Sequence, residues 1–258
     1  VTVRVLPRDF ARDPDERAAL IQRARVLATL SHPNVTALFD VGEHEGRLYL
    51  VFEFLKGQSL RAEMAGRMMN VRRAVELAIQ IADAVADAHS AGFIHGGLSP
   101  ESIVITAQGH AKIPALALAS RDGFAASGTG QLHDYDAPEE ARGLPPDERS
   151  DIYSVGAVMY ETLTGRRPMH RGAAAPSGSN PHVPPELDEV VLKAVAPNPD
   201  NRFQSAATFA AQLRSLGAQL DARGVLSDEE DPDAERTSNN VTRVVLTAGT
   251  ILAGAGVL

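Results

Sequence analysis

The chain has 258 residues, of which 44% are hydrophobic and 22% are charged, so it is long and apolar enough to bury the core of a soluble globular protein. It contains no cysteine, which excludes a disulfide framework and a zinc site built on cysteine thiolates. The formal net charge of -8 argues against a broad nucleic-acid-binding surface, because such a surface must be basic to displace counterions. We therefore expect a globular protein with no nucleic-acid partner.

Residues 1–55 carry the pattern of a small lobe made of strands and one helix. Residues 1–6 alternate apolar and polar side chains, as a half-buried strand does. Acidic residues and a proline at positions 13–16 then start a helix, whose leucines and alanines recur at helical spacing until a later proline stops it. Two more strands are expected over residues 35–41 and 47–54, on either side of a turn.

Residues 56–217 are dominated by helical patterns, which predict a larger helical lobe. The clearest is an amphipathic helix over residues 71–91, and Gly92 ends it because glycine tolerates the left-handed conformation that follows many helices. Further helices are expected over residues 150–163, 187–195 and 206–216, and a strand over residues 111–117.

The stretch between the amphipathic helix and a short β-like run reads Phe93-Ile94-His95-Gly96-Gly97-Leu98-Ser99-Pro100-Glu101-Ser102. In that place protein kinases carry a catalytic loop written H-R-D-L-x-x-x-N. His95 and Leu98 hold their places in this frame, glycines stand at the Arg and Asp positions, and Ser102 stands at the Asn position. Two later segments also match motifs of kinases: Ala137-Pro138-Glu139 matches A-P-E, and Asn198-Pro199-Asp200-Asn201-Arg202 matches N-P-x-x-R.

The chain therefore resembles the bacterial Ser/Thr protein kinases over about residues 1–216. The resemblance implies an α+β, two-lobed protein-kinase-like fold, with residues 1–55 belonging to the small β-rich lobe and residues 56–217 forming the helical lobe. It also assigns structural roles to four residues. Glu139 and Arg202 match a buried ion pair, Asp151 matches the residue that caps the catalytic-loop backbone, and His95 matches a residue of the apolar column: these are positions that hold the fold.

The residues that perform the chemistry in active kinases are replaced at the matching positions. The catalytic Asp corresponds to Gly97, and the two magnesium ligands correspond to Ser102 and Ala115. The other degenerate positions are those of two phosphate-binding lysines and one helix glutamate, here Arg4, Ser99 and Arg23. Because magnesium requires oxygen ligands in near-octahedral geometry, the resemblance implies no metal and no nucleotide cofactor. We therefore expect a catalytically inactive pseudokinase, and not an enzyme.

The chain changes character after residue 217. Residues 218–240 include a run from Asp228 to Glu235 in which six of eight residues are acidic, so we expect a solvated juxtamembrane linker. Residues 244–258 contain no charged side chain, and we interpret residues 241–258 as the start of a transmembrane helix, with a buried terminal helix as the alternative. The resemblance implies a domain on the cytoplasmic side of the cell membrane.

The linker suggests a function for the expected pseudokinase. Thr237 follows the acidic run, and phosphorylation there would add about -1.5 to -2 charges and three acceptor oxygens. We expect an active Ser/Thr kinase to modify Thr237 and a protein with a forkhead-associated (FHA) domain to bind the product at the membrane. The chain would then act as a scaffold in the regulation of cell-wall peptidoglycan synthesis. Thr129 and Thr242 are the next candidates, and a linker threonine without a role is the alternative.

Two other functions are open at this point. The first is a nucleotide sensor that binds ATP without turnover. The second is a kinase with unorthodox chemistry, for which His95, Asp122 and Asp134 are the nearby candidates. The simpler interpretation makes His95 a core histidine and the two aspartates solvated loop charges.

Overall fold

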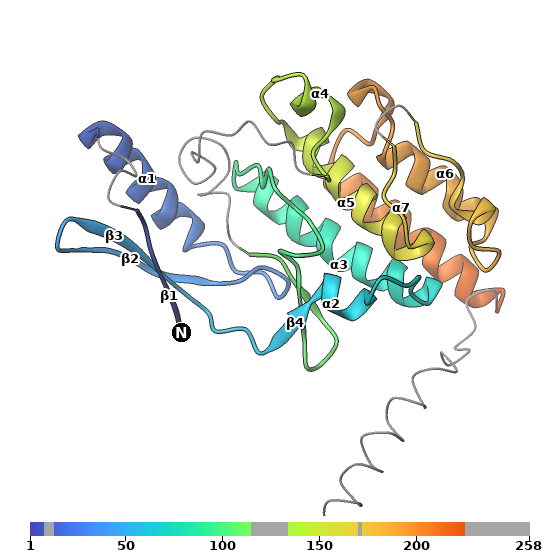
Figure 1. Ribbon diagram of the computed structural model, residues 1–258, viewed down its shortest axis with the longest axis horizontal. Coiled ribbons are helices and arrows are strands. Elements are labelled where there is room, and N and C mark those ends of the chain that lie inside the picture. Colours follow the sequence, from blue (N-terminus) through green and yellow to red (C-terminus); the bar gives the residue numbers. More distant parts are fainter. Residues whose placement is uncertain (8–12, 115–133, 170–171, 225–258) are drawn as a thin grey trace, which may run out of the picture.

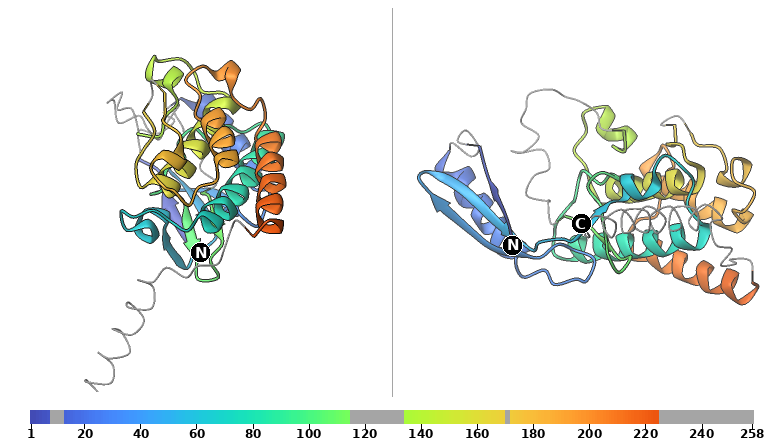
Figure 2. Two further views of the ribbon diagram at one scale, coloured as in Figure 1. Left: turned by 90° about the vertical axis from the view of Figure 1, so that its right-hand side faces the viewer. Right: turned by 60° about the horizontal axis from the view of Figure 1, so that its bottom comes forward.

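The computed structural model describes residues 1–7, 13–114, 134–169 and 172–224. Figures 1 and 2 show two lobes joined end to end, with a β-sheet and one helix at one end and a group of helices at the other. This is the two-lobed α+β architecture that the sequence predicts, so the fold class is confirmed.

The small lobe is a three-stranded antiparallel sheet with helix α1 (Pro14–Leu27) beside it. Its strands are arranged in the order β1 (Thr2–Val5), β3 (Arg47–Phe52) and β2 (Leu38–His44). Alternate side chains of β3 are buried, and they join the buried side chains of α1 in one apolar core: Leu48, Leu50, Phe52, Leu20, Ala24 and Leu27. The helix begins where the sequence indicates, because the carboxylate of Asp13 accepts a hydrogen bond from the Asp15 amide at 2.8 Å.

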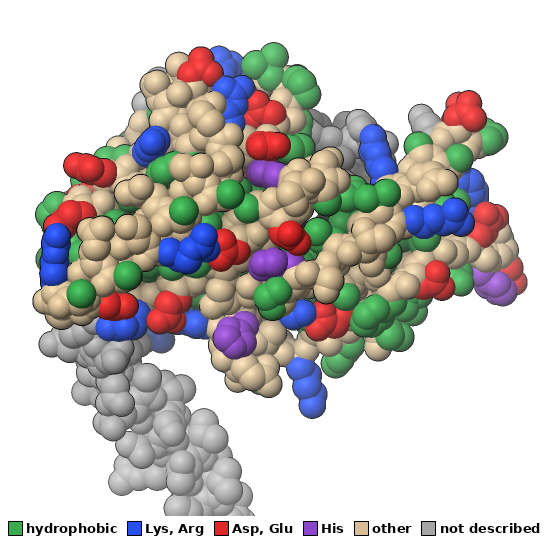
Figure 3. Space-filling model, turned by 180° about the vertical axis from the view of Figure 1, so that it is seen from behind, with side chains coloured by type: hydrophobic (Ala, Val, Ile, Leu, Met, Phe, Trp, Pro, Cys, Tyr) green, Lys and Arg blue, Asp and Glu red, His purple; other side chains and the backbone are tan. Residues whose placement is uncertain are grey.

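Strand β1 lies at the edge of the sheet and exposes its side chains. Val1, Val3 and Val5 are each more than half exposed, and Figure 3 shows apolar side chains on the surface of this lobe. Within the described residues, β1 pairs only with β3. The expectation of a half-buried strand at residues 1–6 is therefore wrong for most of its length, and only Leu6 is buried.

The large lobe is built around helices α3 and α5. Its helices are α2 (Leu60–Met64), α3 (Val71–Ser90), α4 (Pro138–Ala141), α5 (Glu148–Thr164), α6 (Pro185–Ala194) and α7 (Ala206–Ala222). Single 3-10 turns lie at Pro176–Gly178 and Pro199–Asn201. A second small sheet, with the order β4 (Gly57–Ser59), β5 (Val104–Thr106) and β6 (Ala111–Lys112), lies near the junction of the lobes.

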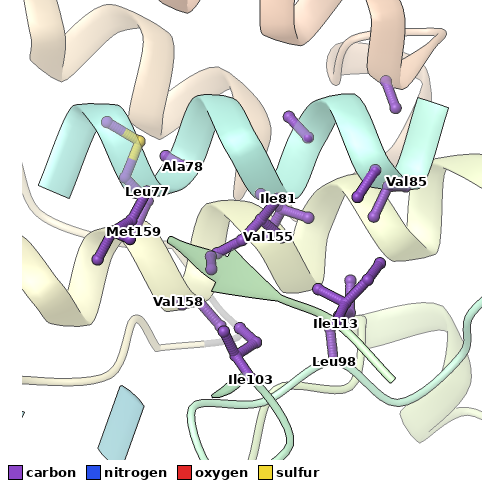
Figure 4. Close-up of a cluster of buried hydrophobic side chains, with 14 of the residues drawn as sticks. Leu77, Ala78, Ile81, Val85, Leu98, Ile103, Ile113, Val155, Val158 and Met159 are labelled. Atoms are coloured by element: carbon purple, nitrogen blue, oxygen red, sulfur yellow. The ribbon is translucent and has the colours of Figure 1, made fainter. Parts of the chain in front are cut away.

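Helix α5 is the centre of the core, because every residue from Ser150 to Thr164 is buried. Such all-round burial marks a helix that other elements enclose. Figure 4 shows side chains of α3 and α5 meeting one another, two apolar residues of the loop between α3 and β5, and the residue that follows β6: Leu77, Ile81, Val85, Val155, Val158, Met159, Leu98, Ile103 and Ile113. Gly156 permits a close approach of α6, since a β-carbon there would lie 2.7 Å from that of Ala194.

The two lobes are joined by backbone hydrogen bonds and an ion pair. The amide of Thr36 donates to the carbonyl of Ile113 at 2.9 Å, and the amide of Ile113 donates to the carbonyl of Asn34 at 2.8 Å. Lys112 of β6 forms an ion pair at 2.6 Å with Glu53, the residue directly after β3. These contacts fix the small lobe to β6 of the large lobe and to the residue that follows it.

Helix α7 extends further than the sequence pattern suggests. We expected the helix to end at residue 216 and a linker to begin at residue 218, but α7 continues to Ala222 because Leu220 is only 1% exposed and belongs to the core. The rest of the expected linker, with Thr237, and the expected membrane segment, with Thr242, lie outside the described residues. Among the residues that the structure describes, no helix is long and apolar enough to span a membrane.

Glu139 and Arg202 form a buried, bidentate ion pair. The two terminal guanidinium nitrogens, Nη1 and Nη2, each donate to the carboxylate at 2.7 Å, and Ser150 Oγ donates to the same carboxylate at 2.9 Å. Arg202 also lies over the ring of Tyr153, with 4.9 Å between its central carbon and the ring centroid. Burial raises the pKa of Glu139, but the hydrogen bonds and charge of Arg202 outweigh burial and hold this pKa below its ordinary range.

Removing either member of this pair leaves a buried charge without compensation. We expect Glu139→Ala and Arg202→Ala each to lower the free energy of unfolding by about 3–5 kcal/mol, measured by urea denaturation. Arg214→Ala is the matched control, because it breaks an exposed pair with Asp83 and should cost less than about 1 kcal/mol. Losses as small as that of the control would show that the buried pair does not brace the lobe.

Candidate functional site

The candidate site is the loop of residues 93–103, which leaves the end of α3. Helix α3 ends at Ser90, and Gly92 adopts the left-handed conformation, with φ of 80°, which turns the chain out of the helix. The amide of Phe93 then donates to the carbonyl of Ala88 at 2.9 Å, and the Phe93 side chain is buried. The loop is thereby directed along α5.

Asp151 of α5 holds the start of this loop. Its Oδ2 accepts hydrogen bonds from the His95 amide at 2.7 Å and from His89 Nε2 at 2.8 Å, and its Oδ1 accepts one from the Gly96 amide at 2.7 Å. The side chain is 1% exposed, so each of these bonds replaces one to water. The structure thus places Asp151 where the resemblance implies a cap on the loop backbone.

His95 is a buried side chain. Its Nε2 lies 3.1 Å from the carbonyl oxygen of Pro114 and donates to it. Burial is the main influence on the imidazole and lowers its pKa, so the ring is neutral at neutral pH. The hydrogen bond directs the ring nitrogen toward a backbone carbonyl, which fits a packing role and not that of a base in unorthodox chemistry.

Gly97 stands where kinases carry the catalytic aspartate, and its surroundings are open. A β-carbon built on Gly97 meets no atom of the described chain within 4 Å, and its φ lies outside the left-handed range. Gly96 differs, because its φ is 61°. The loop therefore has room for a side chain at position 97 without strain of the backbone.

Ser102, at the position of a magnesium ligand, is engaged within its own loop. Its hydroxyl donates to the Ser99 carbonyl at 3.0 Å and accepts from the Ser99 amide at 3.1 Å. Ala115, the other position, lies outside the described residues. The described part of the chain contains no cluster of three His, Cys, Asp or Glu side chains that could hold a metal ion. At these two positions the described residues offer one side-chain oxygen, the hydroxyl of Ser102, which is already engaged with Ser99.

The remaining predicted positions are scattered. Arg4 lies on β1 and Arg23 on α1, and both residues are exposed. Asp134 is 67% exposed and forms an ion pair with Arg167. Two further candidates, Asp122 and Thr129, lie outside the described residues.

Sequence reasoning missed one group of side chains next to the loop. Arg61 of α2 contacts Glu101, Tyr135 and Glu161 at once. These partners lie 40, 74 and 100 residues away in the sequence, so no local pattern indicates them. The available signal was the charged Glu161 within the buried helix α5, because a buried carboxylate must find a partner.

Asp151→Asn should loosen the start of the loop. An amide has one acceptor oxygen and also carries donors, so one of the two backbone N–H groups would lose its partner. We expect a loss of about 1–3 kcal/mol in the free energy of unfolding and faster hydrogen exchange at the His95 and Gly96 amides. Asp83→Asn, at an exposed site, serves as the control. Unchanged protection of both amides would contradict the role given to Asp151.

The buried His95 predicts a dependence of stability on pH. In the unfolded chain this imidazole takes up a proton below about pH 6.5, whereas in the folded protein its lowered pKa delays protonation. The unfolded state then binds more protons, so stability should fall as pH drops below 6.5. His95→Leu should weaken this fall, and His44→Ala, which changes an exposed imidazole, should keep it. The measurement is urea denaturation between pH 7.5 and 5, and equal slopes in wild type and His95→Leu would refute it.

Known proteins are similar to this chain in sequence and in architecture. The protein kinase domain family model matches residues 2–213. The Ser/Thr protein kinase PknB of Mycolicibacterium smegmatis is 38% identical over 92% of this chain and 41% of its own length. The Ser/Thr protein kinase PrkC of Bacillus subtilis is 30% identical over 83% of this chain and 36% of its own length. The crystal structure of the Mycobacterium tuberculosis PknI kinase domain superimposes with a TM-score of 0.66 and 25% identity, covering 83% of this chain and 84% of that one.

These relatives contradict the expectation of an inactive pseudokinase that acts as a scaffold and is not an enzyme. The curated relatives are Ser/Thr protein kinases by name, and their similarity extends over most of this chain. The expectation rested on residue types at a few positions. Catalysis of phosphoryl transfer depends largely on how the whole fold positions the reacting groups, and the residue types at single positions do not show this positioning.

The chain spans about two fifths of the length of the curated relatives it matches. The match to the family model, however, covers most of the chain and includes both lobes. The chain belongs to the protein kinase domain family, and bacterial Ser/Thr protein kinases are among its relatives.

Proposed function

We propose that this chain transfers a phosphoryl group from ATP to serine or threonine residues of proteins. The observation that carries the proposal is the similarity to PknB of M. smegmatis over 92% of the chain. The anchoring of the loop by Asp151 supports it, because the backbone that presents the catalytic position is held by a buried carboxylate.

The residue at position 97 lowers the expected rate. A carboxylate acting as general base contributes roughly 10²–10⁴-fold to an enzymatic rate, and Gly97 supplies none. Protein kinases turn over at about 1–100 per second, and most of their catalysis comes from positioning and electrostatics. Dividing the second range by the first, which allows for the missing base alone, gives a turnover of roughly 10⁻⁴ to 1 per second. Such a rate is slow but measurable with radiolabelled ATP.

The finer features expected from the sequence stay predictions. They are the location at the cytoplasmic face of the cell membrane, the phosphorylation of Thr237 by another kinase and an FHA-domain partner. The resemblance to bacterial kinases also suggested one particular protein, the mycobacterial cell-wall protein MviN, and that identification stays a prediction too. Thr237 lies outside the described residues.

The test is phosphate incorporation from radiolabelled ATP into casein and into the chain itself, with Mg²⁺, with Mn²⁺ and with EDTA. We expect slow incorporation on serine and threonine, located by mass spectrometry. Gly97→Asp should raise the rate by about tenfold or more, because the open space at position 97 accepts a carboxylate.

Gly97→Asn is the matched control, since it adds a side chain of the same shape without a base. An equal rise for both variants would show that the gain comes from packing and not from the carboxylate. No incorporation above the heat-inactivated protein, in wild type and in Gly97→Asp alike, would overturn the proposed function.

A further inference from the structure

Arg61 lies at the centre of a group of charged and polar side chains beside the loop. Its Nε donates to Glu101 Oε1 at 2.7 Å, and its Nη1 donates to Glu161 Oε1 at 2.8 Å. Its Nη2 donates to the hydroxyl of Tyr135, which in turn donates to Glu161. One guanidinium therefore serves three partners from three separate segments.

Those segments are the loop itself, the stretch before α4 and helix α5. Glu101 lies in the loop, four residues after Gly97. Tyr135 lies just before α4, and Glu161 lies in α5, the helix that also carries Asp151. Arg61 thus connects the far end of the loop to the helix that already holds its near end.

Helix α2 is itself fixed against the loop, so Arg61 has a rigid base. The amide of Leu60 donates to the Ile103 carbonyl at 2.8 Å, and the amide of Arg61 donates to the Pro100 carbonyl at 2.9 Å. The side chain of Leu60 is fully buried, and Ser59 caps the helix through the Ala62 amide at 3.1 Å. The backbone from which the Arg61 side chain extends is therefore fixed against the loop.

Because the partners Glu161 and Tyr135 of Arg61 are buried, losing these contacts raises the free energy of the folded state. Glu161 is 8% exposed and Tyr135 is 4% exposed, whereas the Arg61 side chain is 34% exposed. Without the guanidinium, the Glu161 carboxylate would keep the Tyr135 hydroxyl as a donor and lose its ion pair. A buried carboxylate in that position draws in water or another cation, or moves.

We propose that Arg61 is a positioning residue: it holds residues 98–103 of the loop and the segment before α4 against α5. The kinetic part of this inference rests on the proposed function. The structural part concerns only how these segments are held. A planar guanidinium with five donors can serve three acceptors in a fixed geometry, whereas a lysine ammonium is a single point charge.

The structural part is tested by hydrogen exchange on the whole chain. We expect Arg61→Ala to speed exchange about tenfold or more at amides within residues 98–103 and 135–137, and to leave α3 and α7 unchanged. Arg214→Ala, which removes an exposed pair between α7 and α3, is the matched control and should leave both segments protected. N-ethylguanidinium at millimolar concentration should restore protection in Arg61→Ala and change nothing in wild type.

Unchanged exchange in residues 98–103 of Arg61→Ala would overturn the inference. So would an equal acceleration in α3 and α7, because that pattern reports general destabilisation. Where the alanine variant does not fold, Arg61→Lys replaces it, with faster exchange expected in the same two segments and the same outcomes decisive.

The kinetic part uses the incorporation assay. Arg61→Ala should lower the maximal rate about tenfold or more and change the KM for ATP less than about twofold, because a misplaced loop affects the reacting geometry more than ATP binding. An unchanged rate would overturn this part. If the wild type itself incorporates no phosphate, the proposed function fails, and hydrogen exchange still decides the role of Arg61.

Discussion

The structure depends on one buried carboxylate. Asp151 accepts hydrogen bonds from His89, His95 and Gly96, which lie 55 to 62 residues away in the sequence. An ionised group at that depth is tolerated only when it is fully hydrogen-bonded, so the helix that carries it and the loop that satisfies it must form together. Helix α5 is enclosed on all sides, which gives the carboxylate its fixed place.

Two arginines extend this anchoring across the large lobe. Arg202 is buried and pairs with Glu139, which fixes the short helix α4 to the segment before α7. Arg61 is partly exposed and joins the loop to α5 through Glu101 and Glu161. Both use the planar guanidinium to bind several acceptors at once, so elements distant in the sequence share one geometry.

The loop combines a kinase frame with few of the usual reacting groups. Gly97 carries no carboxylate, and the Ser102 hydroxyl closes a turn on Ser99. The loop nevertheless keeps its anchor in α5 through Asp151, and His95 contacts the carbonyl of Pro114 in the stretch after β6. The backbone of the loop is therefore held in one geometry, and under the proposed function such positioning supplies a large share of the catalysis of phosphoryl transfer.

The sequence by itself determined the two-lobed fold and the place of the loop, because motifs and helical periodicity report burial within one element. It predicted α3 closely, where the period is clean and Gly92 ends the helix. Tertiary structure alone decided where α7 ends, since burial of Leu220 depends on packing. It alone decided the contacts of Arg61 too, because its partners are brought together only when α2, the loop and α5 pack. The expectation of inactivity failed for a related reason: residue types at single positions do not measure how a folded loop is held.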